Sequence, residues 1–546
     1  MKSTFLLLLL SLMCSITLQS QDIKATEVSV TEGFKPSIPE ANKLNEQASF
    51  ADTLKVDKSQ TYSTGQFNLK TNYKTRPLKA AKVKDESIAK LYDNQTSIGF
   101  GDNSNKHFSF LHNSKRSADF NYGFILQHIS NKYKPKNYQV KNSQNLFNLD
   151  AKKITSSHIF IANLEYDRRT ASYFNISSQE EEKYFRNRFA FSKVSMTALN
   201  KNSSQSLIKK VNFFLSDFNE MSENQVHLSA DLEKEINSIP INIEIEFNNF
   251  LNYNNKDSRY EPLDLKELHF VPQASFDKIG INFQAGLNFH YDPYRVAVSP
   301  LINVTKELVK DILLISGGVR HNEEKHTLKT VSDVNPYLHS YGSNQAIISR
   351  GGFLQELKST AGEELFFSMR NKLGPNEVFE VSIAYGQFTD FANFLGLDNG
   401  DYNRFVIDYV DLKQLQISLD YTRELNDVMS LDAQADYFNW NKEVYYKPNL
   451  IADISLLINL RDKIKVIPSI KYTGSRLSYK EDSSISQILV DDLPSQFHAN
   501  LMLQYSYTKI LSAYLQLSNL TNSQEALFKG YQEIGFNGVF GINYSF

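Results

Sequence analysis

The C-terminal part of the chain alternates between apolar and polar residues over long stretches. In residues 450–460, LIADISLLINL, every second residue from Leu450 onward is apolar, and polar residues such as Asp453 occupy positions between them. Residues 497–507 and 535–546 show the same alternation. A period of two with one apolar face predicts β-strands that each bury or embed one face.

The connections between these predicted strands are alternately short and long. Short turns are predicted at 372–376, 424–428, 461–463 and 508–509, and longer polar links at 389–401, 439–447, 474–493 and 519–533. An up-and-down meander with tight turns at one rim and longer loops at the other has this rhythm. The strand pattern runs from Thr96 to Phe546 and allows about 18–22 strands, so we expect an all-β fold, a large antiparallel transmembrane β-barrel over 96–546.

A soluble β-sandwich or propeller would alternate in the same way. The strands of such folds are typically about five or six residues long, however, and many of the strands predicted here run past ten. The length of the strands therefore favours the membrane barrel.

The N-terminal part differs from the rest. Residues 1–20 have a basic Lys2, an apolar run and a small residue before a cleavage position, the pattern of a secretory signal peptide. The single cysteine, Cys14, follows Met13 rather than a small residue, which argues against a lipid anchor. Residues 21–95 are proline-containing and sparse in apolar residues, and we expect a short irregular N-terminal extension that is periplasmic or lumenal.

Composition supports a barrel and excludes other classes. The 546 residues carry a net charge of −2, so there is no electrostatic case for binding nucleic acid. The chain has 38 Phe and 29 Tyr, and aromatic residues near strand ends are typical of the girdles that contact outer-membrane lipid. The sequence has no run of about 18 apolar residues, which excludes a transmembrane helix.

Charged and polar residues on the polar faces are the functional candidates. A charge facing lipid at mid-bilayer costs about 2–4 kcal/mol, so these side chains should face the lumen. They would tune what passes, or they would pair with one another across strands. The predicted lumen-lining residues are Glu165, Asp167, Asp420, Asp432, Asp436, Asp453, Lys465, Lys471 and His498.

No motif in the sequence indicates an enzyme, a cofactor or a metal site. Nucleophile, two-metal and phosphate-loop signatures are absent. The acidic runs Glu180–Glu182 and Asp491–Asp492 are typical of solvated loops, and the histidines, among them His128, His158, His290 and His498, are scattered along the chain. We therefore predict no catalytic residue, no cofactor and no metal ligand.

The last residues resemble the C-terminal end of TonB-dependent receptors of the Bacteroidetes type. The shared elements are an NLxN motif at Asn519–Asn522, a GY and a GF pair at 530–531 and 535–536, and an aromatic closing strand. The resemblance covers roughly 350–546. It implies an outer-membrane barrel whose last strand is read by the barrel-assembly machinery, with the side chains of Phe540, Ile542, Tyr544 and Phe546 on its apolar face.

The sequence departs from that family in its N-terminal part. Receptors of that family carry a much longer plug domain after a TonB box, and neither pattern is found in 21–95. The sequence therefore does not predict coupling to TonB. The first hypothesis is a barrel that passes or binds a small solute, served by a partner lipoprotein of the envelope. The second is a structural or assembly barrel that docks other envelope proteins without transport of its own.

Overall fold

A computed structural model describes residues 92–135, 139–172, 186–201, 206–219, 223–252, 265–338, 358–398, 403–482 and 487–546. The chain divides into two units, Met1–Glu86 and Ser87–Phe546, and the described residues all belong to the second. The expected signal peptide and most of the expected N-terminal extension lie outside the described residues. No helix in the described ranges is long and apolar enough to cross a membrane.

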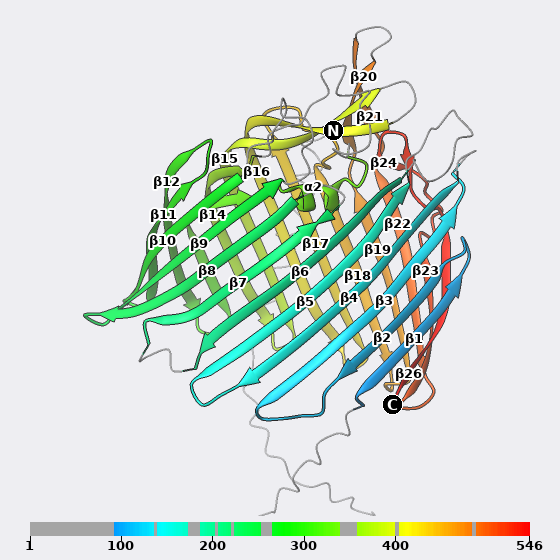
Figure 1. Cartoon of the computed structure of the whole chain (residues 1–546), viewed down its shortest axis with the longest axis horizontal. Coiled ribbons are helices and arrows are strands. Elements are labelled where there is room, and N and C mark those ends of the chain that lie inside the picture. The colour runs from blue at the N-terminus through cyan, green and yellow to red at the C-terminus, as the bar shows by residue number, and fades with distance from the viewer. Residues whose placement is uncertain are drawn as a thin grey trace, which may run out of the picture. The chain divides into compact units, whose positions relative to one another are not determined.

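The second unit is a closed antiparallel barrel (Figure 1). Within the described ranges 24 strands share one sheet; β20 and β21 form a hairpin in a connecting loop, so the remaining 22 make the wall. The first wall strands are β1 Asn94–Gly101, β2 Lys106–Asn113, β3 Phe120–Tyr133, β4 Val140–Ile154, β5 His158–Ser172, β6 Arg186–Asn200, β7 Ile208–Phe218, β8 Glu223–Ile236, β9 Ile239–Asn252, β10 Leu265–Lys278 and β11 Ile281–Tyr291.

The second half of the wall continues the meander. Its strands are β12 Val296–Val309, β13 Leu313–Glu324, β14 Thr360–Gly374, β15 Glu377–Asp398, β16 Asn403–Asn426, β17 Met429–Trp440, β18 Leu450–Leu460, β19 Ile464–Thr473, β22 Gln496–Ser506, β23 Leu511–Ser518 and β26 Asn537–Ser545. The loops hold helix α2 Leu328–Val334 and strands β20 Arg476–Asp482, β21 Gln487–Leu493, β24 Ala526–Phe528 and β25 Tyr531–Gln532.

The first and last strands close the barrel. β1 pairs with β26 in register, with Ile98 opposite Ile542 and Phe100 opposite Phe540. At the end of this ladder the backbone N–H and carbonyl of Asn94 bond to Phe546, both at 3.0 Å. Closure pairs the backbone groups that a sheet edge would leave open, which is a requirement inside a bilayer.

The outer face of the wall is apolar. Side chains of Phe540, Ile542, Tyr544 and Phe546 are about half exposed, and so are those of their neighbours Ile98 and Phe100. On β12, Val296 and Val298 are exposed, while Ser299 is buried and its hydroxyl donates to the Glu363 carboxylate of β14. The period of two in the sequence is therefore the alternation between lipid and lumen.

The two rims differ as the sequence predicts. Short turns, for example at 237–238, 279–280, 427–428 and 461–463, lie at the rim that also holds the start of β1 and the end of β26. The longer connections, with α2, β20, β21 and β24, lie at the opposite rim (Figure 1). Outer-membrane barrels keep the short turns periplasmic, so the rim with the long connections is the outer one.

The predicted link at 389–401 is wrong in part, because β15 continues as a strand to Asp398. A bulge between Phe388 and Phe391 interrupts its pairing with β16, and bulges bend strands. Beyond the bulge Phe391 and Phe394 are both buried. The aromatic side chains of this segment pack in two hydrophobic clusters instead of meeting solvent, as those of a polar link would.

Candidate functional site

The outer mouth of the barrel is filled by a hydrophobic cluster to which wall strands and outer loops contribute. Its buried members are Val140, Ala171, Phe189, Phe218, Leu328, Val331, Leu338, Ala392, Phe394, Phe405, Ile407, Tyr446, Leu493, Phe528 and Tyr531. They come from β4–β7, from β15–β16 about halfway round the wall, from the β17–β18 connection, and from the loops that hold α2, β21 and β24–β25. We call this set the mouth cluster.

Helix α2 is fastened into the mouth at both ends. Thr327 caps its first turn through a reciprocal bond with Thr330, and the Glu223 carboxylate of β8 accepts a bond from the Leu328 backbone N–H at 2.8 Å. After the helix, the Asn187 side chain of β6 donates to the carbonyls of Pro336 and Leu338. The segment after β13 therefore crosses the mouth to reach β6 and β8.

Aromatic stacking joins this segment to the loop before β26. The rings of Tyr337 and Tyr531 stack with centroids 3.6 Å apart, and burial raises the pKa of the Tyr337 hydroxyl. The Tyr133 hydroxyl donates to the Gln532 carbonyl at 3.3 Å. The mouth is thus covered by loops that pack on one another, an arrangement that can open only if these contacts part.

A pocket of about 300 Å³ lies beside the mouth cluster, lined by Phe388, Phe391, Gln414, Trp440, Lys447 and neighbouring residues of β13, β14 and β17–β18. The Lys447 ammonium lies 4.2 Å from the centre of the Phe391 ring, and burial lowers the pKa of Lys447. Burial likewise lowers the pKa of His326 to about 4, and its ring nitrogen lies 2.7 Å from the Thr360 hydroxyl.

The structure places the residues predicted from the sequence on polar faces of six strands, β5, β16, β17, β18, β19 and β22. Glu165 and Asp167 alternate with exposed Leu164 and Tyr166, and Gln144 donates to the Asp167 carboxylate at 3.0 Å. Asp432 and Asp436 accept bonds from hydroxyls of β16, and Asp420 lies opposite Gln434. Whether any of them contacts a solute stays a prediction.

Three of these predicted residues do come together. Lys471 lies opposite Asp453 on one side and opposite His498 on the other, so the three form a row across β18, β19 and β22. The His498 ring nitrogen lies 3.5 Å from the Glu533 carboxylate, which comes from the loop before β26. Lys465 lies opposite Asn459 and Gln504 in the same wall segment, nearer the periplasmic rim.

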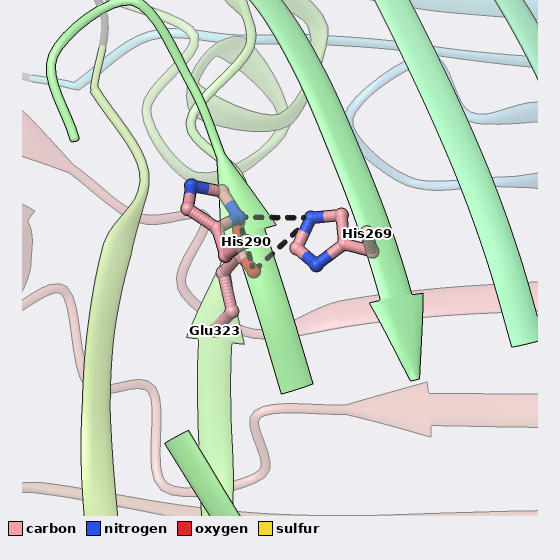
Figure 2. Close-up of side chains that lie close together, drawn as sticks. All are labelled: His269, His290 and Glu323. Carbon is pink, nitrogen blue, oxygen red and sulfur yellow. Dashed lines mark hydrogen bonds and ion pairs between the residues drawn. The ribbon is translucent and has the colours of Figure 1, made fainter. Parts of the chain in front are cut away.

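A buried histidine–carboxylate cluster was missed by the sequence reasoning. Figure 2 shows His269 of β10, His290 of β11 and Glu323 of β13 directed toward one point. His269 Nε2 lies 3.2 Å from His290 Nδ1 and 3.4 Å from the Glu323 carboxylate, which is 3.7 Å from His290 Nδ1. His321 Nε2 lies 3.6 Å from the same carboxylate. We call these four residues the histidine cluster.

The histidine cluster exists because β13 leaves the wall. The ladder between β12 and β13 ends at the pair Ile302–Val319, whereas the ladder between β13 and β14 continues to Glu324–Thr360. The outer end of β13 therefore lies against the lumenal face of β10–β12 rather than beside β12. The only signal in the sequence is that His321 and Glu323 are two apart on a strand, and nothing there brings them to His269 or His290.

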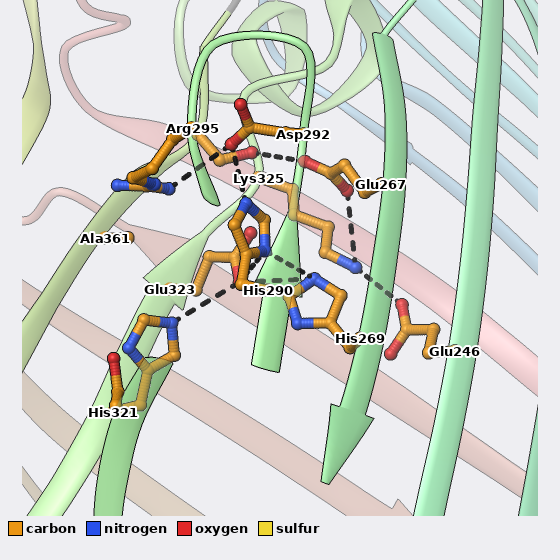
Figure 3. Close-up of polar contacts among 12 residues, drawn as sticks. Glu246, Glu267, His269, His290, Asp292, Arg295, His321, Glu323, Lys325 and Ala361 are labelled. Carbon is orange, nitrogen blue, oxygen red and sulfur yellow. Dashed lines mark hydrogen bonds and ion pairs between the residues drawn. The ribbon is translucent and has the colours of Figure 1, made fainter. Parts of the chain in front are cut away.

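Charged side chains surround the histidine cluster (Figure 3). The Lys325 ammonium lies 2.5 Å from the Glu246 carboxylate and 3.5 Å from that of Glu267. Burial alone would lower the pKa of Lys325, but these two carboxylates raise it. Burial would raise the pKa of Asp292, but hydrogen bonds from His290 and from the Tyr294 N–H lower it.

A closed wall of 22 strands with an apolar outer face and a polar lumen defines this chain as an outer-membrane β-barrel. No family model and no curated protein matches it. Several solved structures match the fold of this chain. The FrpB iron transporter of Neisseria meningitidis matches with a TM-score of 0.60 at 10% identity, over 84% of this chain and 82% of FrpB.

Two further structures match in the same way. The ferric enterobactin receptor PfeA of Pseudomonas aeruginosa has a TM-score of 0.58 at 11% identity, over 83% of this chain and 80% of PfeA. The ferric-catecholate import receptor Fiu of Escherichia coli K12 has a TM-score of 0.56 at 10% identity, over 84% of this chain and 82% of Fiu. The expected resemblance to TonB-dependent receptors is thus confirmed for the fold.

Proposed function

We propose that this chain is a gated outer-membrane barrel that passes a small polar or charged solute. The observation that carries the proposal is the mouth cluster, which covers the outer opening above a lumen lined with charged side chains. A cover made of loops fits a pathway that opens and closes. Uptake as the direction of transport is supported by the solved neighbours, an iron transporter, a ferric enterobactin receptor and a ferric-catecholate import receptor.

The specificity of the pathway would reside in the lumenal wall and the outer loops. The row of Asp453, Lys471 and His498 offers both signs of charge at one level of the lumen. Passage without an energy source would identify a channel, whereas binding without passage would identify a receptor that needs an energised partner.

Single-channel recording on the purified barrel in planar bilayers tests the proposal. We expect rare openings in the wild type and more frequent openings in Tyr337→Ala, because this variant removes the ring that stacks on Tyr531. Tyr507→Ala is the matched control, since this tyrosine is 66% exposed in the turn between β22 and β23, at the rim opposite the mouth. No conductance in either protein at any voltage, with or without residues 22–95, would overturn the proposal.

A further inference from the structure

The structure assigns a metal-binding site to the histidine cluster: we propose that His269, His290, His321 and Glu323 bind one first-row divalent transition-metal ion of the zinc type. The inference is independent of the proposed solute passage. Imidazole nitrogen and carboxylate oxygen are the protein ligands that such ions take, and three histidines with one carboxylate make a complete tetrahedral set.

The distances fit such an ion. A tetrahedral ion with bonds of about 2.0–2.1 Å separates its ligand atoms by roughly 3.3 Å. The three donor atoms of His269, His290 and Glu323 are separated by 3.2, 3.4 and 3.7 Å. His321 Nε2 lies 3.6 Å from the same oxygen of Glu323 but outside the group of three donor atoms that are all within 4.8 Å of one another, so its ring has to move toward the ion to become the fourth donor. The donor atoms of His269, His290 and Glu323 are already grouped at the spacing that coordination requires.

The orientation of His290 also fits a ligand. Its Nε2 lies 2.6 Å from the Asp292 carboxylate, so this nitrogen carries the proton and Nδ1 presents a lone pair toward His269 and Glu323. Asp292 is held in turn by the Tyr294 backbone N–H at 2.7 Å and by Arg295. Histidine ligands of metals commonly donate their other N–H to a carboxylate in this way, which fixes the tautomer and the ring.

Unpartnered atoms point to a ligand that completes the cluster. Both ring nitrogens of His321 and Oε1 of Glu323 are buried and have no hydrogen-bond partner among the described residues. The side chains of His321 and Glu323 are 8% and 9% exposed, so water does not solvate them freely. Buried polar groups are nearly always satisfied, and a cation bound in the cluster would give one ring nitrogen of His321 a partner.

The charge balance favours a cation as well. Among the residues labelled in Figure 3, four carboxylates (Glu246, Glu267, Asp292 and Glu323) face two cationic side chains, Lys325 and Arg295. With neutral imidazoles these labelled residues carry two net negative charges in a partly buried region. A divalent ion would offset that charge and would join the wall strands β10 and β11 to the outer end of β13, which the β12 ladder no longer holds.

Metal binding to the purified full-length barrel in detergent tests the assignment. After treatment with a chelator, reloading with Zn²⁺ and dialysis of the excess, we expect one Zn²⁺ per chain by elemental analysis. Reloading with Co²⁺ instead should give the visible absorption of a tetrahedral site. His269→Ala and His290→Ala should lose this binding, and Asp292→Asn should weaken it about 10- to 100-fold. His128→Ala is the control, because this histidine bonds Asn145 outside the cluster.

One variant separates a metal site from a merely structural network. His321→Leu removes a buried group without a hydrogen bond, so it should keep or raise the thermal midpoint of the metal-free barrel while it abolishes the rise that Zn²⁺ produces. A wild type that binds no stoichiometric Zn²⁺ or Co²⁺, or a His269→Ala variant that binds them as the wild type does, would overturn the assignment.

Discussion

The Tyr514 hydroxyl of β23 lies 2.8 Å from Nδ1 of His107 on β2, and the tyrosine side chain spans the two strands between them. On the way it covers Gly541 of β26 and Gly99 of β1, where an added Cβ would lie only 2.3 Å and 2.5 Å from the tyrosine. A single side chain thus crosses the seam at which the barrel closes. An aromatic ring over glycines is a known means of stabilising a sheet at such positions.

The stability of the closed barrel should depend on the Tyr514 side chain. Tyr514→Phe loses one hydrogen bond and should cost about 1 kcal/mol, whereas Tyr514→Ala empties a buried site and should cost about 3 kcal/mol. Urea unfolding followed by the heat-dependent gel shift of folded barrels measures both. Equal stability of Tyr514→Ala and wild type would refute the role of the ring.

The glycine beneath the ring gives a separate prediction. Gly541→Ala should displace Tyr514 and lower the yield of folded barrel, because the new Cβ would overlap the ring. Gly374→Ala is the matched control, since its Cβ would meet only Glu377 at 3.9 Å. A similar yield of the two variants would contradict the prediction.

Stability should fall in mild acid because of His326. Burial lowers its pKa to about 4, below the usual 6.5, so the unfolded chain binds a proton that the folded barrel rejects. The contribution of neutral His326 to the free energy of unfolding is complete above pH 6.5 and is lost as the pH falls toward 4. Between pH 7 and pH 5 the free energy of unfolding should fall by about 2 kcal/mol for this reason. We expect the thermal midpoint of His326→Asn to drop less over this interval than that of the wild type. Equal drops would assign the acid sensitivity to other groups.

The lumenal row should set ion preference if solute passes through it. Lys471→Glu replaces a positive charge between Asp453 and His498 with a negative one. The reversal potential in a salt gradient should then shift toward cation selectivity. Lys463→Glu makes the same change of charge in an exposed periplasmic turn and should shift it much less. A Lys471→Glu barrel with the wild-type reversal potential would remove Lys471 from the pathway.

Removal of metal should loosen the mouth. Ser332 of α2 is fully buried, and Cys14 is the only natural cysteine. In the C14S background, Ser332→Cys should react with a maleimide slowly when Zn²⁺ is bound and faster after chelation, because α2 follows β13 by three residues. The same variant carrying His269→Ala should react at the fast rate with or without Zn²⁺. A labelling rate that chelation leaves unchanged in the first variant would show that the ion does not hold the mouth.

The sequence by itself determined the wall of this protein. Alternation in segments such as 450–460 requires one apolar and one polar face, and only a closed barrel satisfies both the backbone and the lipid. For the same reason the tight turn at 461–463 and the pairing of an aromatic last strand could be predicted from local pattern. These features depend on residues that are neighbours in the chain or on adjacent strands.

Only the tertiary structure decided what the lumen contains. Phe391 and Phe394 lie in a segment that the sequence predicts as a polar link, and both are buried. Phe394 belongs to the mouth cluster, whereas Phe391 packs with Leu412 and Val444. His269 and Glu323 are 54 positions apart, and they meet because β13 leaves β12 after Val319. The point at which a strand leaves its neighbour depends on packing across the barrel. The alternation of apolar and polar residues along one strand carries no information about it.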